Sequence, residues 1–335
     1  HSSSPQVIDD PDYDDSDRED TDPIEPSNLE RHLHLGTALA TEEVDPIVDD
    51  GRDVGIPTSG SETYKDCISS PDLSSSQQQE IQALLCSFKE ILTDVPGKTS
   101  SIEHVIELTT DIPVRHSYPL PHSLSGQLQS DLDIWMELGV VESSNSPYCS
   151  PLLAVRKKEG NYRICVDSRH INRITKFDAE PIADLQEIFF QLSSAKFLTK
   201  MDLSSGFWQV PLSDESKKFT AFSTRFGHYQ FKVMPFGLVN APATFSRLMR
   251  MVTKGLKDTY CYMDDILISS STWLEHLESV EAILVRLKQH GLTVKPTKCM
   301  FGFQRLDYLG HLVGGGCYTP LGKQMQCHQR DASSQ

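Results

Sequence analysis

Two adjacent carboxylates, Asp264 and Asp265, interrupt a run of aromatic and aliphatic residues in the segment TYCYMDDILIS, residues 259–269. A buried carboxylate without a partner is costly, so a packed strand should not hold two of them side by side. Neighbouring residues of a continuous strand point to opposite faces, so both side chains can reach one ion only at a turn. The segment predicts a β-hairpin with Met263 and Asp264 at its tip, where two repelling carboxylates suit a divalent cation such as Mg²⁺.

A third isolated acid, Asp202, ends another predicted strand in FLTKMDLSSGFWQV, residues 197–210. The turn SSG that follows has backbone N–H groups that could cradle phosphates. Three carboxylates from two strand ends are typical of a two-metal site, in which one ion activates a nucleophile and the other holds the leaving oxygens. An ordinary hairpin turn remains the alternative at this point, because Asp is also a good turn residue.

Helical and strand patterns surround these acids in irregular order. Apolar residues recur at helical spacing in the segments 75–92, 125–139, 182–192, 241–256 and 271–291. Ser125 and Asn240 are expected to cap two of these helices, and Gly291 to end the last one. Strand patterns fall at 103–109, 151–158, 162–168, 197–204, 207–213, 219–224, 228–237, 260–269, 292–299 and 306–313. Because strands and helices intermix without the regular alternation of a doubly wound sheet, the sequence predicts an α+β fold.

The negative charge of the chain is concentrated at its N-terminal end. Residues 1–66 hold 19 acids and 4 bases, a net charge of −15, which leaves −1 of the total of −16 for the rest. Few apolar residues accompany this acidic run, so residues 1–72 are predicted to be a disordered acidic linker. Any nucleic-acid surface must then come from local clusters of Lys and Arg in the remainder.

Cysteine usage and hydropathy limit the cellular setting. The eight cysteines are scattered and form no CxxC pair, which indicates free thiols in a reducing compartment. No run of about 18 apolar residues occurs, so no membrane partner is expected. A cytoplasmic location is the expectation that fits both observations.

Several further segments stand in a fixed order around the acids: SPYCSPLLAVRKKEGNYRICVDSRHIN, MDLSSGFWQVPL, TAFSTRFGHYQFKVMPFGLVNAPATFSRLM, YMDD, GLTVKPTKCMFG and YLGHLVG. The set resembles the polymerase of gypsy-type long-terminal-repeat retrotransposons, over about residues 73–321. The resemblance implies a right-hand polymerase fold with fingers at 73–198, and a palm at 199–315 that receives a fingers insertion at about 218–236. Residues 316–335 do not follow the amphipathic pattern of a thumb helix and read as its truncated or aberrant start.

The activity implied by this resemblance is RNA-directed DNA polymerisation, in which a primer 3′-oxygen attacks the α-phosphate of a dNTP. Asp202, Asp264 and Asp265 would be the catalytic residues and, with the backbone of Leu203, the ligands of two Mg²⁺ ions, for which Mn²⁺ could substitute. The partners would be dNTP and a primer on an RNA or DNA template. A parent polyprotein would also carry protease, ribonuclease H and integrase.

Further residues acquire roles from the resemblance alone. Those expected to bind dNTP are Lys157, Arg163, Ser204, Ser205, Gly206, Phe207, Phe236 and Lys298. Phe207 would be the steric gate against a ribose 2′-hydroxyl, and Lys298 would lie near the leaving pyrophosphate. Those expected to contact primer or template are Tyr262, Met263, Leu309, Gly310 and His311. The rival hypotheses are an inactive transposon relic and a derived nucleic-acid-binding protein.

Overall fold

The computed structural model describes residues 60–113, 120–156, 162–181, 185–193 and 195–320. All of them lie in one compact unit, Glu43–Gln335, while a second unit, His1–Glu42, lies outside the described residues. Helices and strands intermix along this unit, and most strand pairs are antiparallel. The predicted α+β class is confirmed.

A five-stranded sheet carries the two segments with the acids. Its strand order is β1 (Ile68–Ser69), β10 (Met300–Phe303), β5 (Phe197–Asp202), β9 (Asp265–Ser270) and β8 (Thr259–Tyr262). Only the pairing of β1 with β10 is parallel. The central pair, β5 and β9, is in continuous antiparallel register from Phe197 opposite Ser270 to Asp202 opposite Asp265.

The two faces of this sheet bury different apolar clusters. Along β9, Ile266 and Ile268 belong to the main core, whereas Leu267 between them belongs to a smaller second core. On β5, Met201 joins the main core and Leu198 the second one. This alternation follows from the two-residue period of a strand, and it assigns each remaining side chain of β5 and β9 to one face.

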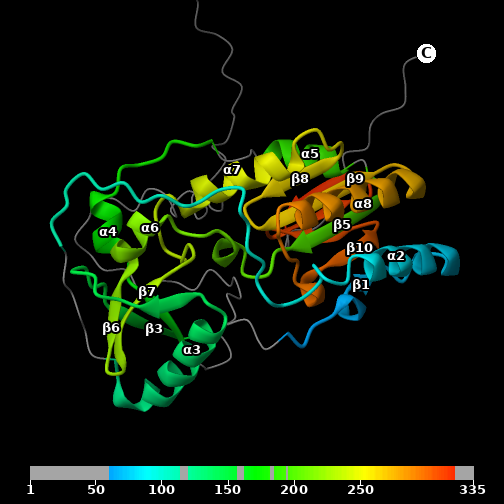
Figure 1. Ribbon diagram of the computed structural model, residues 1–335. Coiled ribbons are helices and arrows are strands. Elements are labelled where there is room, and N and C mark those ends of the chain that lie inside the picture. Colours follow the sequence, from blue (N-terminus) through cyan, green and yellow to red (C-terminus); the bar gives the residue numbers. More distant parts are fainter. Residues whose placement is uncertain (1–59, 114–119, 157–161, 182–184, 194, 321–335) are drawn as a thin grey trace, which may run out of the picture. The chain divides into compact units, whose positions relative to one another are not determined.

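Helices and a small sheet cover the two faces (Figure 1). α7 (Ala241–Thr253), α8 (Trp273–Gln289) and α2 (Ser75–Ser87) contribute to the main core. A capping box fixes the start of α8, since the Thr272 hydroxyl accepts from the Glu275 N–H and the Glu275 carboxylate accepts from the Thr272 N–H. The second core is formed by α5 (Leu185–Ser193) and the antiparallel sheet of β11 (Leu306–Tyr308), β12 (His311–Gly314) and β13 (Cys317–Pro320).

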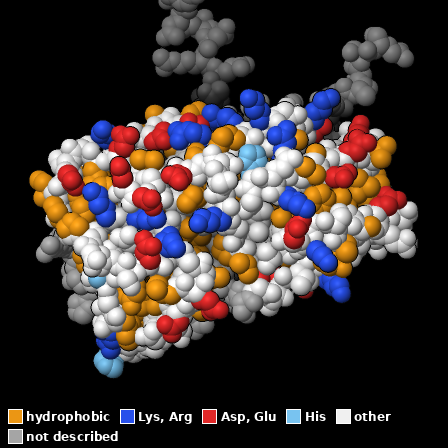
Figure 2. Space-filling view, in the orientation of Figure 1, with side chains coloured by type: hydrophobic (Ala, Val, Ile, Leu, Met, Phe, Trp, Pro, Cys, Tyr) orange, Lys and Arg blue, Asp and Glu red, His pale blue; other side chains and the backbone are white. Residues whose placement is uncertain are grey.

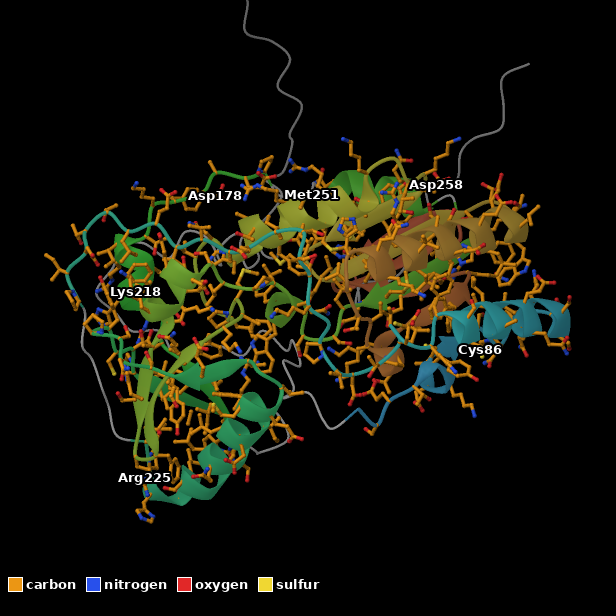
Figure 3. All side chains as sticks on the ribbon, viewed as in Figure 1. Cys86, Asp178, Lys218, Arg225, Met251 and Asp258 are labelled. Carbon is orange, nitrogen blue, oxygen red and sulfur yellow. The ribbon has the colours of Figure 1, made fainter. Side chains whose placement is uncertain are left out.

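The remaining elements build the region drawn at the left of Figure 1. They are a sheet of β2 (Val141–Ser143), β7 (Gly227–Phe231) and β6 (Phe222–Thr224), a hairpin of β3 (Leu152–Arg156) and β4 (Tyr162–Val166), and the helices α3 (Ser125–Glu137), α4 (Arg169–Ile174) and α6 (Asp214–Lys217). Trp135 packs edge-on against Trp208 and Phe222, which joins α3 to the sheet. Arg225 lies at the exposed tip between β6 and β7, away from the five-stranded sheet (Figure 3).

Local structure differs from the prediction in several places. The segments 103–109, 207–213 and 292–299 form only isolated bridges and 3₁₀ turns, not strands, because Ser205 adopts a left-handed conformation and Pro296 begins a turn. α2 ends at Ser87, before the predicted end at residue 92. Leu124, not Ser125, is the N-cap of α3, and the Asn240 side chain makes no capping bond.

The N-terminal boundary also differs from the prediction. Disorder was expected to residue 72, but a 3₁₀ turn at Tyr64–Asp66 and strand β1 precede that point. β1 is held because the Ile68 N–H donates to the Cys299 carbonyl and the Ser70 N–H to the Phe301 carbonyl, both at 2.9 Å. The Cys67 side chain is buried beside them. The sheet thus extends into the segment that composition alone assigned to the linker.

On the face drawn in Figure 2, acidic and basic side chains are interspersed and not segregated into one large patch. Within the described part of the chain, none of the helices combines the length and apolar character needed to cross a membrane.

Candidate active site

The paired acids lie at a tight hairpin, as the sequence predicts. β8 enters and β9 leaves, Tyr262 faces Asp265 across the ladder, and Met263 and Asp264 form the two-residue turn. Met263 has φ 54°, a left-handed conformation that a residue with a side chain adopts only at a cost. The turn places the backbone carbonyl of Asp264 against β5, where it accepts a hydrogen bond from the Leu203 N–H at 3.3 Å.

The third acid joins the pair through the strand register. Asp202 and Asp265 are direct partners in the β5–β9 ladder, so their side chains leave the sheet on the same face. Because side chains alternate along a strand, Asp202 and Asp265 point to the face of the sheet that packs against the second core and β11–β13. The structure therefore brings Asp202, Asp264 and Asp265 together at one end of the central strand pair.

Two lysines approach these carboxylates from different elements. Lys200, two residues before Asp202 on β5, places its Nζ 3.1 Å from Oδ1 of Asp265. Lys298, on the 3₁₀ turn Pro296–Lys298, places its Nζ 3.7 Å from Oδ2 of Asp202. That turn is anchored to the same strand, since the Lys295 N–H donates to the Asp202 carbonyl at 2.9 Å.

Burial and mutual repulsion raise the pKa of two of these carboxylates, Asp202 and Asp265. Burial raises the pKa of Asp202 to about 7, the charges of Asp264 and Asp265 add to the rise, and Lys298 and Lys200 oppose it. Burial also raises the pKa of Asp265, against the pull of Lys200. An added cation would relieve both effects. Carboxylate oxygens from a turn and an adjacent strand are the hard donors that Mg²⁺ prefers, so the residues fit such an ion.

In the arrangement described, the acids are not close enough together to coordinate a metal ion. Among the described residues, no group of three or more His, Cys, Asp and Glu side chains is gathered closely enough to hold an ion as it stands. Asp202 and Asp265 both have lysine partners in this arrangement. Binding of an ion would require the side chains to turn away from these amines.

A glycine brings the next segment against the catalytic turn. A Cβ on Gly206 would lie 3.0 Å from Cζ of Phe245 and 3.3 Å from Cβ of Asp264. Only a residue without a side chain allows this approach without displacement. The half-buried Phe207 ring that follows stacks on Phe236 with ring centroids 5.2 Å apart, and also contacts Phe245 at 5.3 Å. The two predicted pocket aromatics, Phe207 and Phe236, are thus one stacked wall beside the acids.

Ser204 does not fit its predicted role at the phosphates. It is 1% exposed, its N–H donates to the Thr293 carbonyl at 3.1 Å, and its hydroxyl donates to the Thr93 carbonyl at 2.5 Å. Both donors therefore support the fold. Ser205 is half-buried with φ 48°, and together with Gly206 it remains the part of this turn predicted to face a ligand.

Of the two basic residues predicted to bind the triphosphate, Arg163 is described and Lys157 is not. Arg163 lies on β4 opposite Val155, in a sheet separate from that of the acids. Lys157 lies outside the described residues. The role of both in binding a triphosphate stays a prediction.

The predicted primer hairpin lies on the carboxylate face. β11 and β12 are joined by Leu309 and Gly310, both with positive φ, and the His311 ring lies 4.6 Å from that of Phe189. Leu309 and Met263 pack against the same second core. The tip of this hairpin and the catalytic turn are therefore supported by one apolar cluster.

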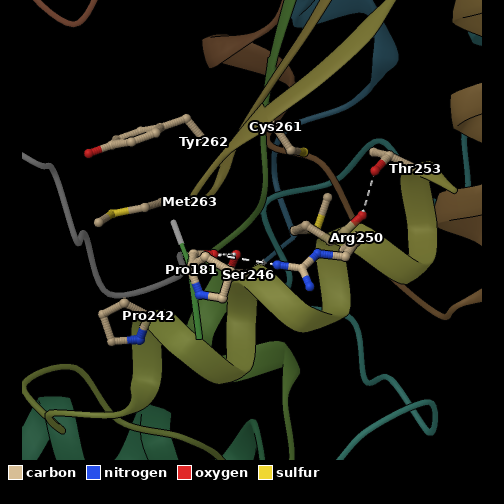
Figure 4. Close-up of a pocket in the computed structure, with 9 residues that line it drawn as sticks. Pro181, Pro242, Ser246, Arg250, Thr253, Cys261, Tyr262 and Met263 are labelled. Atoms are coloured by element: carbon tan, nitrogen blue, oxygen red, sulfur yellow. Dashed lines mark hydrogen bonds between the residues drawn. The ribbon is translucent and has the colours of Figure 1, made fainter. Parts of the chain in front are cut away.

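A pocket of about 330 Å³ lies between the β8–β9 hairpin and α7 (Figure 4). Cys261, Tyr262 and Met263 of the β8 hairpin line it together with Pro242 and Arg250 of α7. The Arg250 guanidinium also forms an ion pair with Glu180 at 2.6 Å. Tyr262 and Met263, which directly precede the acids in the sequence, thus border this pocket. Their contact with a primer or template stays a prediction.

Sequence reasoning missed Lys200 and Tyr308. Tyr308, on β11, is 1% exposed and its ring centroid lies 5.6 Å from Nζ of Lys200. A signal for Lys200 existed, because a residue two before Asp202 on a strand shares its face. No local signal exists for Tyr308, since its approach depends on how β11 packs on the sheet.

The fold and the acids together define the palm of a nucleic-acid polymerase. The family described as reverse transcriptase (RNA-dependent DNA polymerase) matches residues 155–313. The Drosophila melanogaster Pol polyproteins of transposon 297 and transposon opus are 37% and 34% identical over 223 and 248 residues, which is 64% and 70% of this chain. Residues 155–313 therefore belong to the reverse transcriptase family, and the chain is similar to the Pol polyproteins of retrotransposons.

Solved structures agree with this fold. A foamy viral protease-reverse transcriptase in complex with an RNA/DNA hybrid has a TM-score of 0.71 at 21% identity, covering 77% of this chain and 35% of that one. The native prototype foamy virus protease-reverse transcriptase has a TM-score of 0.67 at 26% identity, covering 76% and 35%. The chain spans only about a fifth to a quarter of the curated relatives, covering 21% of the transposon 297 protein and 25% of the opus protein.

Proposed function

We propose that this chain is an RNA-directed DNA polymerase that extends a primer with dNTP on an RNA or DNA template. The observation that carries the proposal is the cross-strand pair Asp202–Asp265 with Asp264 at the adjoining turn. Family membership supports the same reaction. We place the element among gypsy-type long-terminal-repeat retrotransposons on the order and spacing of its sequence motifs.

Asp202, Asp264 and Asp265, with the backbone of Leu203, would hold two Mg²⁺ ions, and Mn²⁺ could take their place. Such ions lower the pKa of the attacking hydroxyl and neutralise the leaving oxygens. The protein itself contributes position and charge, which dominate phosphoryl transfer. Lys298, already within reach of Asp202, would neutralise the departing pyrophosphate.

The nucleotide would lie against the wall of Phe207 and Phe236. The Phe207 ring packs between Phe236 and the buried Phe245, which restricts its movement. A ring held in this way under the sugar leaves no room for a 2′-hydroxyl. Ser205, Gly206, Arg163 and Lys157 would meet the phosphates, with Ser204 excluded for the reasons given above.

The primer end would lie between the catalytic turn and the β11–β12 hairpin. Tyr262 and Met263 border it on one side, and Leu309, Gly310 and His311 on the other. In this arrangement the fingers correspond to residues 73–198 and the palm to 199–315. Protease, ribonuclease H and integrase would be activities of a parent polyprotein, and a cytoplasmic location fits its reduced cysteines.

Primer extension on poly(rA)/oligo(dT) with dTTP and Mg²⁺ tests the proposal. The parent protein should extend the primer, and the double variant Asp264→Asn, Asp265→Asn should not. Both proteins must first show the same circular dichroism spectrum and bind the duplex. If the folded parent binds the duplex and adds no nucleotide, the polymerase proposal fails and a nucleic-acid-binding relic replaces it.

A further inference from the structure

Lys200 occupies an unusual place for a lysine. It lies on the central strand β5 of the five-stranded sheet, and its side chain is only 21% exposed. Its ammonium lies 3.1 Å from Oδ1 of Asp265 and 5.6 Å from the centroid of the Tyr308 ring. The first belongs to the catalytic hairpin and the second to β11 of the predicted primer hairpin.

Stability alone gives a poor reason for this position. Withdrawing an ammonium and a carboxylate from water costs about as much as their attraction returns, so an apolar pair at the same place would serve the fold equally well. The neighbours of Lys200 on this face of β5 are the buried Leu198 and Asp202. The presence of a lysine at position 200 is therefore explained by the nearby acids and not by the packing of the core.

The charges around Lys200 show what it does in the metal-free protein. Three carboxylates converge at the end of β5–β9, and two amines offset them from different sides: Lys298 at Asp202 and Lys200 at Asp265. A divalent cation bound by either oxygen of Asp265 would lie close to the ammonium that contacts Oδ1. Two cations beside one carboxylate repel each other strongly.

We propose that Lys200 is the counter-ion of the catalytic carboxylates. It forms an ion pair with Asp265 in the metal-free protein and is displaced from this carboxylate when a divalent metal ion binds. The inference rests on the proposed metal-binding role of the acids. Lys200 is thus a positioning residue that competes with the metal.

The Tyr308 ring gives the displaced ammonium a second place to bind. A cation over an aromatic face is attracted to it, more strongly where water is excluded, and Tyr308 is almost fully buried. Lys200 can shift from the carboxylate toward this ring without leaving the site. Metal binding at Asp265 is thereby linked to the hairpin that carries Leu309 and His311.

Direct metal binding tests this role without any need for activity. The dissociation constant for Mn²⁺ is measured by electron paramagnetic resonance in the absence of dNTP and nucleic acid. The proteins are the parent, Lys200→Met, Lys200→Arg, the double variant Asp264→Asn, Asp265→Asn, and the matched control Lys176→Met. Lys176 also forms an ion pair at 3.2 Å, with Glu107, but both partners are exposed and belong to another part of the chain.

Lys200→Met should bind Mn²⁺ about fivefold more tightly than the parent, or about 1 kcal/mol, because a competing cation has been removed. Lys200→Arg and Lys176→Met should keep the parent affinity. Unchanged or weaker binding by a folded Lys200→Met overturns the inference while leaving the metal site in place. Equal Mn²⁺ binding by the parent and the double aspartate variant would instead show that the acids are not the site, and would overturn both proposals.

Discussion

The two faces of the β5–β9 strand pair are built from alternate residues of the same segments, yet they differ in chemistry. One face presents Met201, Ile266 and Ile268 to the helices α7 and α8, and all three side chains are fully buried. The other face presents Lys200, Asp202 and Asp265, each ionisable and each close to an oppositely charged partner. The difference shows that stability and chemistry are separated by a single residue step along each strand.

This separation depends on the strand register. If the register slipped by one residue, the acids would point into the core covered by α7 and α8, and the core residues would point to the face that now carries the acids. The continuous pairing from Phe197–Ser270 to Asp202–Asp265 excludes such a slip. Face-specific substitutions should therefore affect either stability or activity, and seldom both.

The largest expected effect is on the chemical face. Asp202→Asn should lower primer extension by about 10³-fold, or about 4 kcal/mol of transition-state stabilisation, because one carboxylate of the metal site is lost. Its free energy of unfolding at pH 8 should be equal to or higher than that of the parent, since a buried repelling charge is removed. Asp214→Asn, at an exposed carboxylate, is the control for both measurements. A strong loss of stability in Asp202→Asn would contradict the division between the faces.

The second largest effect should be a loss of stability after a substitution on the face covered by α7 and α8. Ile268→Ala should lower the free energy of unfolding by about 3 kcal/mol, because a fully buried side chain leaves a cavity below α8. Urea denaturation measures it, with Leu274→Ala as the control because that side chain is 68% exposed. Under conditions where Ile268→Ala is folded, its primer extension should stay within about threefold of the parent, since no acid has moved. A loss of activity as large as that of Asp202→Asn would show that the faces are coupled.

Several parts of this arrangement could be predicted from the sequence because they depend on short-range patterns. The Met263–Asp264 turn follows from two acids between apolar strands, and the helix of residues 273–289 from its apolar stripe and from Gly291 beyond its end. The predicted strand at 207–213 failed because Ser205 turns the chain locally into a 3₁₀ helix. The Ser204 prediction failed because its partners, Thr93 and Thr293, come from distant segments. Lys200 was missed because its partner is set by the β5–β9 register.

The pH dependence of stability should also differ between the faces. For Asp202 the folded pKa of about 7 exceeds the ordinary 3.8, so the folded state holds a proton that the unfolded state has lost, and stability falls as pH rises from 3.8 to about 7. On the helix-covered face, burial lowers the pKa of His276 to about 4 from 6.5. There the unfolded state binds more protons, so stability rises with pH between about 4 and 6.5.

Comparing Asp202→Asn with the parent isolates the contribution of the Asp202 carboxylate to the pH dependence of stability. The difference in free energy of unfolding between Asp202→Asn and the parent should be small near pH 4, grow with pH, and level off above about pH 7 at roughly 2–4 kcal/mol. The contribution of His276 is common to both proteins and cancels. Adding Mg²⁺ at pH 8 should shrink the difference by stabilising only the parent. A difference that does not change with pH would contradict the raised pKa of Asp202.

The smallest expected effect tests how closely the phosphate turn and the catalytic turn are packed. Gly206→Ala would place a methyl group 3.0 Å from the buried ring of Phe245 and 3.3 Å from Cβ of Asp264, so one of them must shift by a few tenths of an ångström. We expect about a tenfold loss of primer extension and about 1 kcal/mol of lost stability. Gly126→Ala on α3 is the matched control, because its new methyl group meets no atom within 4 Å. It should keep the parent's primer extension, and its stability should equal or exceed that of the parent because Ala favours a helix over Gly. If Gly206→Ala lost stability but kept full activity, the position of Asp264 would not depend on this contact, and the chemical face would tolerate more movement than its close packing indicates.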